Sequence, residues 1–234
     1  MLRIGHRGAA ALAPENTIES VRAAVAVGVD GVEFDVRPDL VVRHDRGRGG
    51  PTLADFLAEV REVVADDALL IVDLKRAGYE AETLSACRAA GVADRCIFST
   101  SEFAALARLN DVARTSATLS AGRAWLPQGL RTPAIAMYAR SGALDATVRH
   151  DTVTEELIEA VHERGGRVYA WTVNTRAGIA RMRALGVDGV ITDDPRLFHP
   201  AAEGPGADGP SRRGLCNSGE PRRNFRRIIL VETQ

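Results

Sequence analysis

Short apolar runs alternate with longer stretches of helical periodicity along most of the chain. Apolar runs typical of buried strands occupy residues 2–5, 31–36, 69–74, 96–99, 114–118, 134–138, 167–172 and 189–192. Between them, apolar residues recur at helical spacing in residues 17–27, 52–65, 79–90, 102–109, 154–164 and 175–185. Glycines that are typical helix stop signals follow four of these helical segments, at Gly28, Gly91, Gly165 and Gly186.

Eight strands that alternate with helices predict an α/β fold, a (β/α)8 TIM barrel. A doubly wound open sheet is the alternative, because strand order is not visible in a sequence, and the strands between 114 and 138 have the weakest patterns. In a barrel, catalytic groups gather where strands end. Side chains capable of chemistry do lie at or just past the predicted strand ends: His6, Glu33, Asp35, Asp73, Lys75, Ser99, Trp171 and Asp193. The positions of these side chains are independent of the alternation that predicts the barrel, so they support it.

The last part of the chain breaks the alternation. Residues 200–211 are rich in proline and glycine, and arginine pairs and the apolar run 228–231 follow them. We therefore predict a catalytic domain at residues 1–199 and a tail at 200–234, disordered to about Asn224. The arginine pairs are more typical of a solvated tail than of a site for an anionic partner. The apolar run can dock on the domain or on another subunit, and the oligomeric state stays open.

Composition excludes several classes of function. The chain has 234 residues, 45% of them hydrophobic, and a net charge of −1, so nothing in its bulk charge favours nucleic acid or membrane surfaces. It has no apolar run long enough for a transmembrane segment and no export signal at its start. The three cysteines, Cys87, Cys96 and Cys216, lack metal-ligand spacing. We expect a reduced, cytoplasmic protein.

Glu33 and Asp35 are the first candidates for chemistry. Residues two apart on a strand point to the same face, so their carboxylates would repel each other on an otherwise apolar strand. A bound cation would remove the repulsion, and oxygen ligands without cysteine suit a hard ion such as Mg²⁺ or Ca²⁺. The alternative is a solvated strand end with no ligand.

Lys75 is the only lysine among 30 basic residues, and it ends a strand-like run that also contains Asp73. Heavy arginine usage is typical of a GC-rich genome, so a retained lysine indicates a position that needs a compact point charge. Chance placement is the alternative. Asp73, two residues earlier on the same strand face, favours the functional interpretation.

Seven motifs together resemble the glycerophosphodiester phosphodiesterase family, and they follow that family's order. They are His6-Arg7-Gly8, Pro14-Glu15-Asn16-Thr17, Glu33-x-Asp35, His44-Asp45, Asp73-Leu74-Lys75, Trp171-Thr172-Val173-Asn174 and the segment 186–195. Each motif is weak alone, but the ordered set covers about residues 2–198.

The resemblance implies a TIM barrel that hydrolyses glycerophosphodiesters to sn-glycerol 3-phosphate and an alcohol with one divalent cation, Mg²⁺ or Ca²⁺. Matched by position, Glu33, Asp35 and Asp73 would be the metal ligands, and His6 and His44 the acid/base pair. Arg7 and Lys75 would hold the phosphate, Glu15 would support the site, and Trp171 would line the pocket or pack the barrel top. We assign His44 as the acid and His6 as the base.

Three departures from the family pattern set expectations for this chain. The third ligand is Asp73, where the family usually has the longer glutamate. The hairpin after Asp35 is shortened, which puts the placement of His44 in question. The insertion that usually follows the second histidine is reduced to residues 46–51, and we expect an open cleft with a loose or larger alcohol preference.

Two other functions compete with the phosphodiesterase. One is a phosphodiester lyase resembling sphingomyelinase D or phosphatidylinositol phospholipase C, and the other is a non-catalytic barrel that binds a phosphodiester. The sequence leaves open whether water or the glycerol 2-hydroxyl attacks the phosphorus. Asn174 and Asp193 are expected to cap the next segment or to fix loops. Ser99 is expected to lie in a turn, and a position in the site is the alternative.

Overall fold

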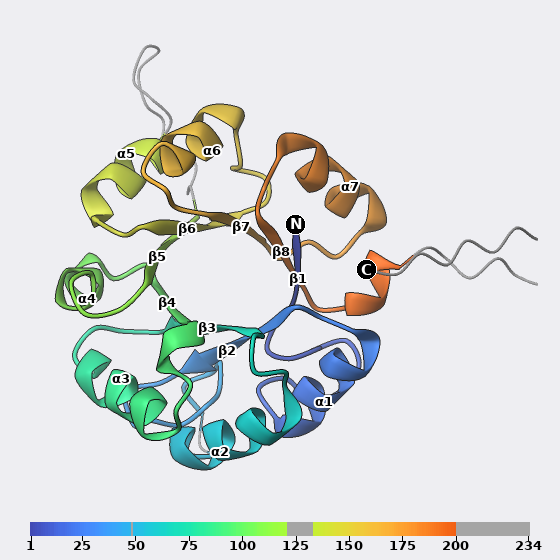
Figure 1. The fold of residues 1–234 in the computed structure, drawn as a ribbon, viewed down its shortest axis with the longest axis vertical. Helices are drawn as coiled ribbons and strands as arrows, with labels where there is room; N and C mark the ends of the chain where they lie inside the picture. The colour runs from blue at the N-terminus through green and yellow to red at the C-terminus, as the bar shows by residue number, and fades with distance from the viewer. Residues whose placement is uncertain (48, 121–132, 200–234) are drawn as a thin grey trace, which may run out of the picture. The chain divides into compact units, whose positions relative to one another are not determined.

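The computed structural model describes residues 1–47, 49–120 and 133–199, and these residues form one closed barrel of parallel strands (Figure 1). Every strand pairs with its neighbours in chain order, and the last pairs with the first. The strands are β1 (Leu2–Gly5), β2 (Gly31–Val36), β3 (Leu69–Leu74), β4 (Cys96–Thr100), β5 (Thr115–Leu119), β6 (Asp145–Arg149), β7 (Val168–Trp171) and β8 (Gly189–Thr192). The predicted barrel is confirmed and the open sheet is excluded.

Helices surround the barrel, as Figure 1 shows. They are α1 (Ile18–Val27), α2 (Leu53–Val63), α3 (Glu80–Ala89), α4 (Phe103–Leu109), α5 (Pro133–Ser141), α6 (Glu155–His162) and α7 (Arg176–Leu185), with short 3₁₀ turns η1 (Ala93–Arg95) and η2 (Pro195–Phe198). Thr17, Thr52, Thr154 and Thr175 each cap a helix by accepting a hydrogen bond from a backbone N–H three residues on. The six predicted helices are confirmed, each within two residues at its ends.

One predicted strand is wrong. Residues 134–138 belong to helix α5, and the sixth strand is β6. The buried side chains of α5 include Ala134, Ile135 and Tyr138, a spacing that fits one face of a helix. A five-residue apolar run cannot by itself distinguish a buried strand from a buried helix.

The sequence pattern did not predict strand β6, because the strand begins with the charged residue Asp145. Asp145 is fully buried, and the Arg114 guanidinium donates two hydrogen bonds to its carboxylate at 2.7 and 2.8 Å. The backbone N–H of Arg167 donates a third hydrogen bond, at 2.8 Å. An aspartate so satisfied can start a buried strand, although in sequence it is typical of a turn.

Aliphatic side chains fill the barrel interior around one aromatic ring. Ile4, Ile71, Ile97 and Ile191 pack with Tyr169, all of them at most 1% exposed. Gly189 makes room for that ring, because a Cβ there would lie 2.8 Å from the Tyr169 side chain. Two larger apolar clusters lie between the strands and the helices. The interior is thus a packed core, and a site can form only above it, at the strand ends.

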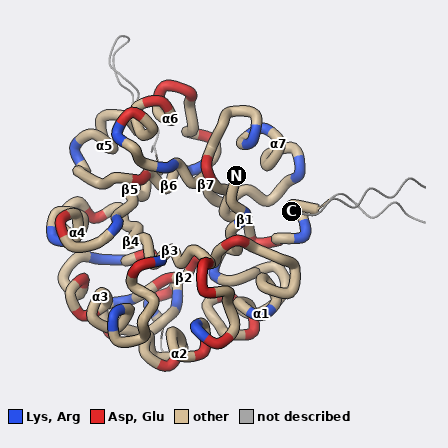
Figure 2. The backbone as a smooth tube through the Cα atoms, in the orientation of Figure 1, with Lys and Arg blue, Asp and Glu red and all other residues tan. Residues whose placement is uncertain are grey.

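Charge is distributed over the whole ring of helices. In Figure 2, segments of both signs are interspersed around the outside, and acidic and basic segments also lie close together near β2 and β3. Within the described ranges, no helix is long and apolar enough to cross a membrane. The predicted tail at 200–234 lies outside the described residues, so its disorder and the domain boundary stay predictions.

Candidate active site

The turn after β1 brings His6 and Arg7 against β2. The Arg7 backbone N–H donates to Glu33 Oε2 at 2.9 Å, and the Gly8 N–H donates to the Glu33 carbonyl at 3.1 Å. Gly8 has a φ of 85°, and a Cβ there would lie 2.2 Å from the Ser20 hydroxyl of α1. The glycine is therefore needed for both the left-handed turn and the close approach of the helix.

Three carboxylates meet at the ends of two neighbouring strands. Glu33 and Asp35 are two apart on β2, and Asp35 is paired in register with Asp73 of β3. One carboxylate oxygen from each residue lies within 4.8 Å of the other two. Alternation along the strands and the parallel register explain why all three point to the same region. The shorter Asp73 is thus brought into the group that the sequence predicted.

The three carboxylates do not share one electrostatic environment. Burial and the charge of Asp35 raise the pKa of Glu33 to about 7. Burial likewise raises the pKa of Asp73, and the Lys75 cation offsets this only in part. Burial opposes ionisation of Asp35 too, but Lys75 and Arg7 outweigh it and lower the pKa of Asp35. Bringing three such groups together is costly unless positive charge lies beside them.

Two cationic side chains supply part of that charge. The Lys75 ammonium forms ion pairs with both Asp35 and Asp73. Arg7 Nε lies 3.1 Å from Asp35 Oδ2, and Arg7 Nη1 donates to Glu15 Oε2 at 2.6 Å. Glu15 thus contacts Arg7 rather than the three carboxylates, and it fixes the direction of the guanidinium.

The carboxylate group is suited to a hard divalent cation. Asp35 Oδ1 is buried and pairs with the Lys75 ammonium, which leaves a further lone pair on this oxygen. An oxygen with free lone pairs, close to oxygens of Glu33 and Asp73, is the donor set that Mg²⁺ and Ca²⁺ use. The residues present therefore fit the ion that the sequence led us to expect.

His6 is oriented by a hydrogen bond to a residue that lies 187 positions later in the chain. Its Nδ1 lies 2.5 Å from Asp193 Oδ1, and because a carboxylate can only accept, Nδ1–H donates. Asn174 Nδ2 donates to the other oxygen of Asp193 at 2.5 Å. Burial disfavours the charged imidazole, but Glu33 and Asp193 outweigh it and raise the pKa of His6. Asp193 and Asn174 were expected only to fix loops, and the contact of Asp193 with His6 was missed.

His44 lies apart from this group. Its side chain is 41% exposed, and its Nδ1 lies 3.0 Å from Asp45 Oδ1. The short hairpin is closed by an antiparallel bridge between Val36 and Val42, and the Arg43 N–H donates to the Asp35 carbonyl at 3.1 Å. The hairpin therefore holds the backbone of His44 near the end of β2, but the side chain does not line the cavity described below.

Asn16 is a second residue whose role the sequence did not reveal. It is 3% exposed, and its Nδ2 donates to Asp35 Oδ2 at 2.8 Å. Its Oδ1 accepts the Asp35 backbone N–H at 2.9 Å, and its own N–H donates to the Arg7 carbonyl at 3.0 Å. With a φ of 60°, it adopts a conformation that asparagine tolerates better than most residues. The motif position alone suggested only a helix start.

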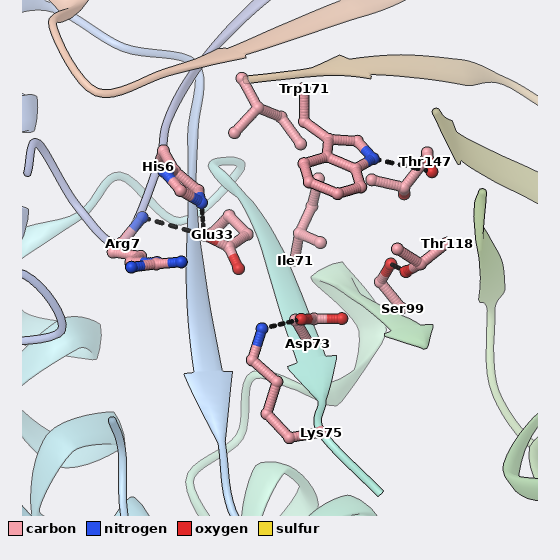
Figure 3. Close-up of a pocket in the computed structure, with 11 residues that line it drawn as sticks. His6, Arg7, Glu33, Ile71, Asp73, Lys75, Ser99, Thr118, Thr147 and Trp171 are labelled. Carbon is pink, nitrogen blue, oxygen red and sulfur yellow. Dashed lines mark hydrogen bonds and ion pairs between the residues drawn. The ribbon is translucent and has the colours of Figure 1, made fainter. Parts of the chain in front are cut away.

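His6, Arg7 and some of the charged side chains near them surround a cavity at the strand ends (Figure 3). It is lined by His6, Arg7, Glu33, Ile71, Asp73, Lys75, Ser99, Thr118, Thr147, Trp171 and Ile191. Its volume is about 70 Å³. Trp171 was predicted either to line the pocket or to pack the top of the barrel, and it lines the cavity. Ser99 lies inside strand β4 and lines the cavity as well, so the predicted turn position is wrong.

Comparisons with known proteins identify the family. The profile of the glycerophosphoryl diester phosphodiesterase family matches residues 6–47 and 51–197. A glycerophosphodiester phosphodiesterase from Caldanaerobacter subterraneus subsp. tengcongensis is 29% identical over 237 residues, covering 84% of this chain and 96% of that protein.

Solved structures share the fold. A glycerophosphodiester phosphodiesterase from Thermotoga maritima has a TM-score of 0.65 at 24% identity, covering 85% of this chain and 97% of that one. A phosphodiesterase from Oleispira antarctica, solved with the product sn-glycerol 3-phosphate, has a TM-score of 0.64 at 22% identity, covering 82% and 93% of the two chains. By its family match, its closed barrel and its ordered motifs, this chain belongs to the glycerophosphoryl diester phosphodiesterase family.

Proposed function

We propose how this chain, a glycerophosphodiester phosphodiesterase by family, hydrolyses its substrate to sn-glycerol 3-phosphate and an alcohol. The observation that supports the proposal most is the juxtaposition of three carboxylates with two cations and a histidine at the strand ends. A phosphodiester carries one negative charge, and more develops during attack on phosphorus. The site offers positive charge and a proton acceptor within one small cavity.

Glu33, Asp35 and Asp73 would hold one divalent cation, either Mg²⁺ or Ca²⁺, because both ions take oxygen ligands. When bound, the ion would polarise a phosphate oxygen as a Lewis acid. The Asn16 side chain supports this arrangement, since its two hydrogen bonds fix the direction of the Asp35 carboxylate.

Arg7 and Lys75 would bind the phosphate oxygens. The Arg7 guanidinium is oriented by Glu15 and Asp35, which leaves further N–H donors for an anion. Lys75 contributes a compact charge between Asp35 and Asp73. Both cations are therefore positioned before the substrate arrives.

The two histidines would move protons. Because the Nδ1–H of His6 donates a hydrogen bond to Asp193, its Nε2, 3.8 Å from Glu33 Oε2, is the atom that can accept a proton from the nucleophile. His44 would donate a proton to the leaving alkoxide, from the exposed hairpin beside the site. The nucleophile is water or the glycerol 2-hydroxyl, and the second case would produce a cyclic phosphate first.

Turnover of glycerophosphocholine with and without EDTA tests the function. We expect chelation to abolish release of sn-glycerol 3-phosphate and Mg²⁺ or Ca²⁺ to restore it. Full activity in excess chelator, with elemental analysis showing no metal, would remove the assignment of Glu33, Asp35 and Asp73 as ligands. Phosphorus NMR separates the alternatives: a cyclic phosphate as end product indicates a lyase, and binding without turnover a non-catalytic barrel.

Small glycerophosphodiesters are the only partners that we propose. The cytoplasmic location remains a proposal from the sequence.

A further inference from the structure

The active-site cavity has a charged side and an uncharged side. Among the residues that the structure describes, the ionisable ones that line the cavity all come from β1 to β3 and the turns that follow them. The lining residues of β4, β5 and β6 are Ser99, Thr118 and Thr147, which carry hydroxyl groups and no charge. We call these three residues the hydroxyl wall. Figure 3 shows them grouped on the side away from His6 and Arg7.

The hydroxyl groups of the hydroxyl wall can form more hydrogen bonds than they form with one another. The hydroxyl oxygens of Ser99 and Thr118 lie 2.7 Å apart, and Thr147 pairs with Ser116 at 2.6 Å. Each hydroxyl has one proton and two lone pairs, so a pair uses only one of its two protons. Within the described part of the chain, the Ser99–Thr118 pair therefore keeps a donor and several acceptors that a ligand can use. Such a surface suits neutral hydroxyl groups better than ions.

Apolar surfaces border the hydroxyl wall. The Trp171 Nε1 donates to the Thr147 carbonyl at 3.1 Å, which fixes the indole beside the wall. Ile71 and Ile191 line the same cavity. A polyol presents hydroxyl and C–H groups together, so it can use both kinds of surface. The cavity volume of about 70 Å³ is enough for several water-sized groups, since one water needs roughly 10–15 Å³ on the same scale, and a small polyol fits that size.

We propose that the hydroxyl wall binds the glycerol moiety of the substrate, and that Ser99 and Thr118 select a small uncharged polyol through its terminal hydroxyl. The proposal rests on the proposed function, because the phosphate must lie on the charged side for the glycerol to reach the wall. The second alcohol of the diester then points away from the wall and is not selected by it. A site built to hydrogen-bond a hydroxyl rejects analogues that lack it.

A pair of ligands that differ in one hydroxyl tests this selection. sn-Glycerol 3-phosphate is compared with 2-hydroxypropyl phosphate, which keeps the 2-hydroxyl and lacks only the terminal one. Calorimetry measures binding of each to the wild type, Ser99→Ala and Thr118→Val. We expect the wild type to bind the glycerol compound about 10- to 100-fold more tightly, a typical cost of leaving a polar site unpaired. Each substitution should reduce that preference to a few-fold by weakening glycerol binding alone.

Thr115→Val is the matched control. Thr115 lies on the same strand as Thr118, but its hydroxyl bonds to Asn110 at 2.6 Å and does not line the cavity. This variant should keep the wild-type preference, and circular dichroism checks that all variants fold. Equal binding of the two ligands by the wild type, or equal losses for both in Ser99→Ala and Thr118→Val, would overturn the proposal.

Turnover separates the failure of this proposal from the failure of the proposed function. The corresponding phosphocholine diesters are compared by kcat/KM in the same variants. If both diesters are hydrolysed with equal kcat/KM, the proposed phosphodiesterase function stands and the role of the hydroxyl wall is rejected. Absence of hydrolysis rejects the proposed function, while the binding preference is still decided by calorimetry.

Discussion

At the residue scale, the orientation of His6 depends on Asp193, 187 positions later in the chain. With Nδ1 donating to that carboxylate, the free nitrogen faces the cavity side. We expect His6→Ala to lower kcat by roughly 10²–10⁴, the usual size for loss of a general acid or base. His44→Ala should have an effect in the same range, because His44 is the proposed acid for the leaving group. Steady-state turnover measures both, and circular dichroism checks the fold.

His150→Ala is the control for the histidine variants, because His150 belongs to none of the family motifs and its side chain does not line the cavity. It should leave kcat nearly unchanged. A His44→Ala variant with wild-type activity would mean that the exposed side chain beside Asp45 takes no part in the chemistry.

The sequence predicted the residues of the site better than their contacts. Strand-end positions and motif order indicated the three carboxylates, Arg7 and Lys75, because alternation along a strand is local information. The contacts of Asn16 with Asp35, and of Asp193 with His6, join segments far apart in the chain. No local pattern shows such a contact, so both were missed. The hydroxyl wall was missed for the same reason, since its members lie on three strands.

Asp73 is the residue at which this chain departs from the ligand pattern that the family resemblance implies. Its carboxylate reaches the group formed by Glu33 and Asp35, yet it also pairs with Lys75. If the strands keep their positions, the shorter side chain contributes a weak or water-bridged ligand, and Asp73→Glu should strengthen metal binding. We expect this result, because neighbours on both sides fix each strand of a closed barrel. Titration of Mg²⁺ or Ca²⁺ by calorimetry measures it, and tighter binding by the wild type would contradict it.

At the element scale, prediction succeeded where pattern and capping agreed. Seven strands were placed within one residue, and four predicted helices begin after a threonine cap. It failed between 120 and 150, where an apolar helix resembled a strand and a real strand began with Asp145. The carboxylate of Asp145 is acceptable there only because Arg114, just before the neighbouring strand β5, satisfies it, and that pairing is a tertiary contact.

That contact predicts a stability effect. Arg114→Ala would leave the fully buried Asp145 without its bidentate partner, and we expect a loss of about 3 kcal/mol in the free energy of unfolding. Arg149→Ala is the control, because Arg149 pairs with Asp151 in the same geometry but on the surface, where the loss should be about 0–1 kcal/mol. Urea unfolding measures both variants, and equal losses would contradict the role of burial.

At the scale of the whole molecule, the closed barrel buries one phenol at its centre. The Tyr169 hydroxyl is inaccessible and has no hydrogen-bond partner among the described residues. Burial raises the pKa of Tyr169 to about 12, because the phenolate is disfavoured inside the barrel. In the unfolded chain the pKa of tyrosine is about 10. The folded barrel therefore binds this proton more tightly than the unfolded chain does.

The sign of the pH effect follows from that difference. The contribution of Tyr169 to stability is complete below about pH 10 and is lost as the pH rises toward 12. Tyr169→Phe has no phenol to titrate and removes an unsatisfied polar group, so near pH 8 its free energy of unfolding should equal or exceed that of the wild type. Between pH 10 and 12 the variant should gain about 2–3 kcal/mol relative to the wild type. Urea unfolding across this range tests the prediction, and Tyr79, which is present in both proteins, cancels from the difference. If the free energies of unfolding of the two proteins change with pH in parallel, burial does not raise the pKa of Tyr169, and the prediction is wrong.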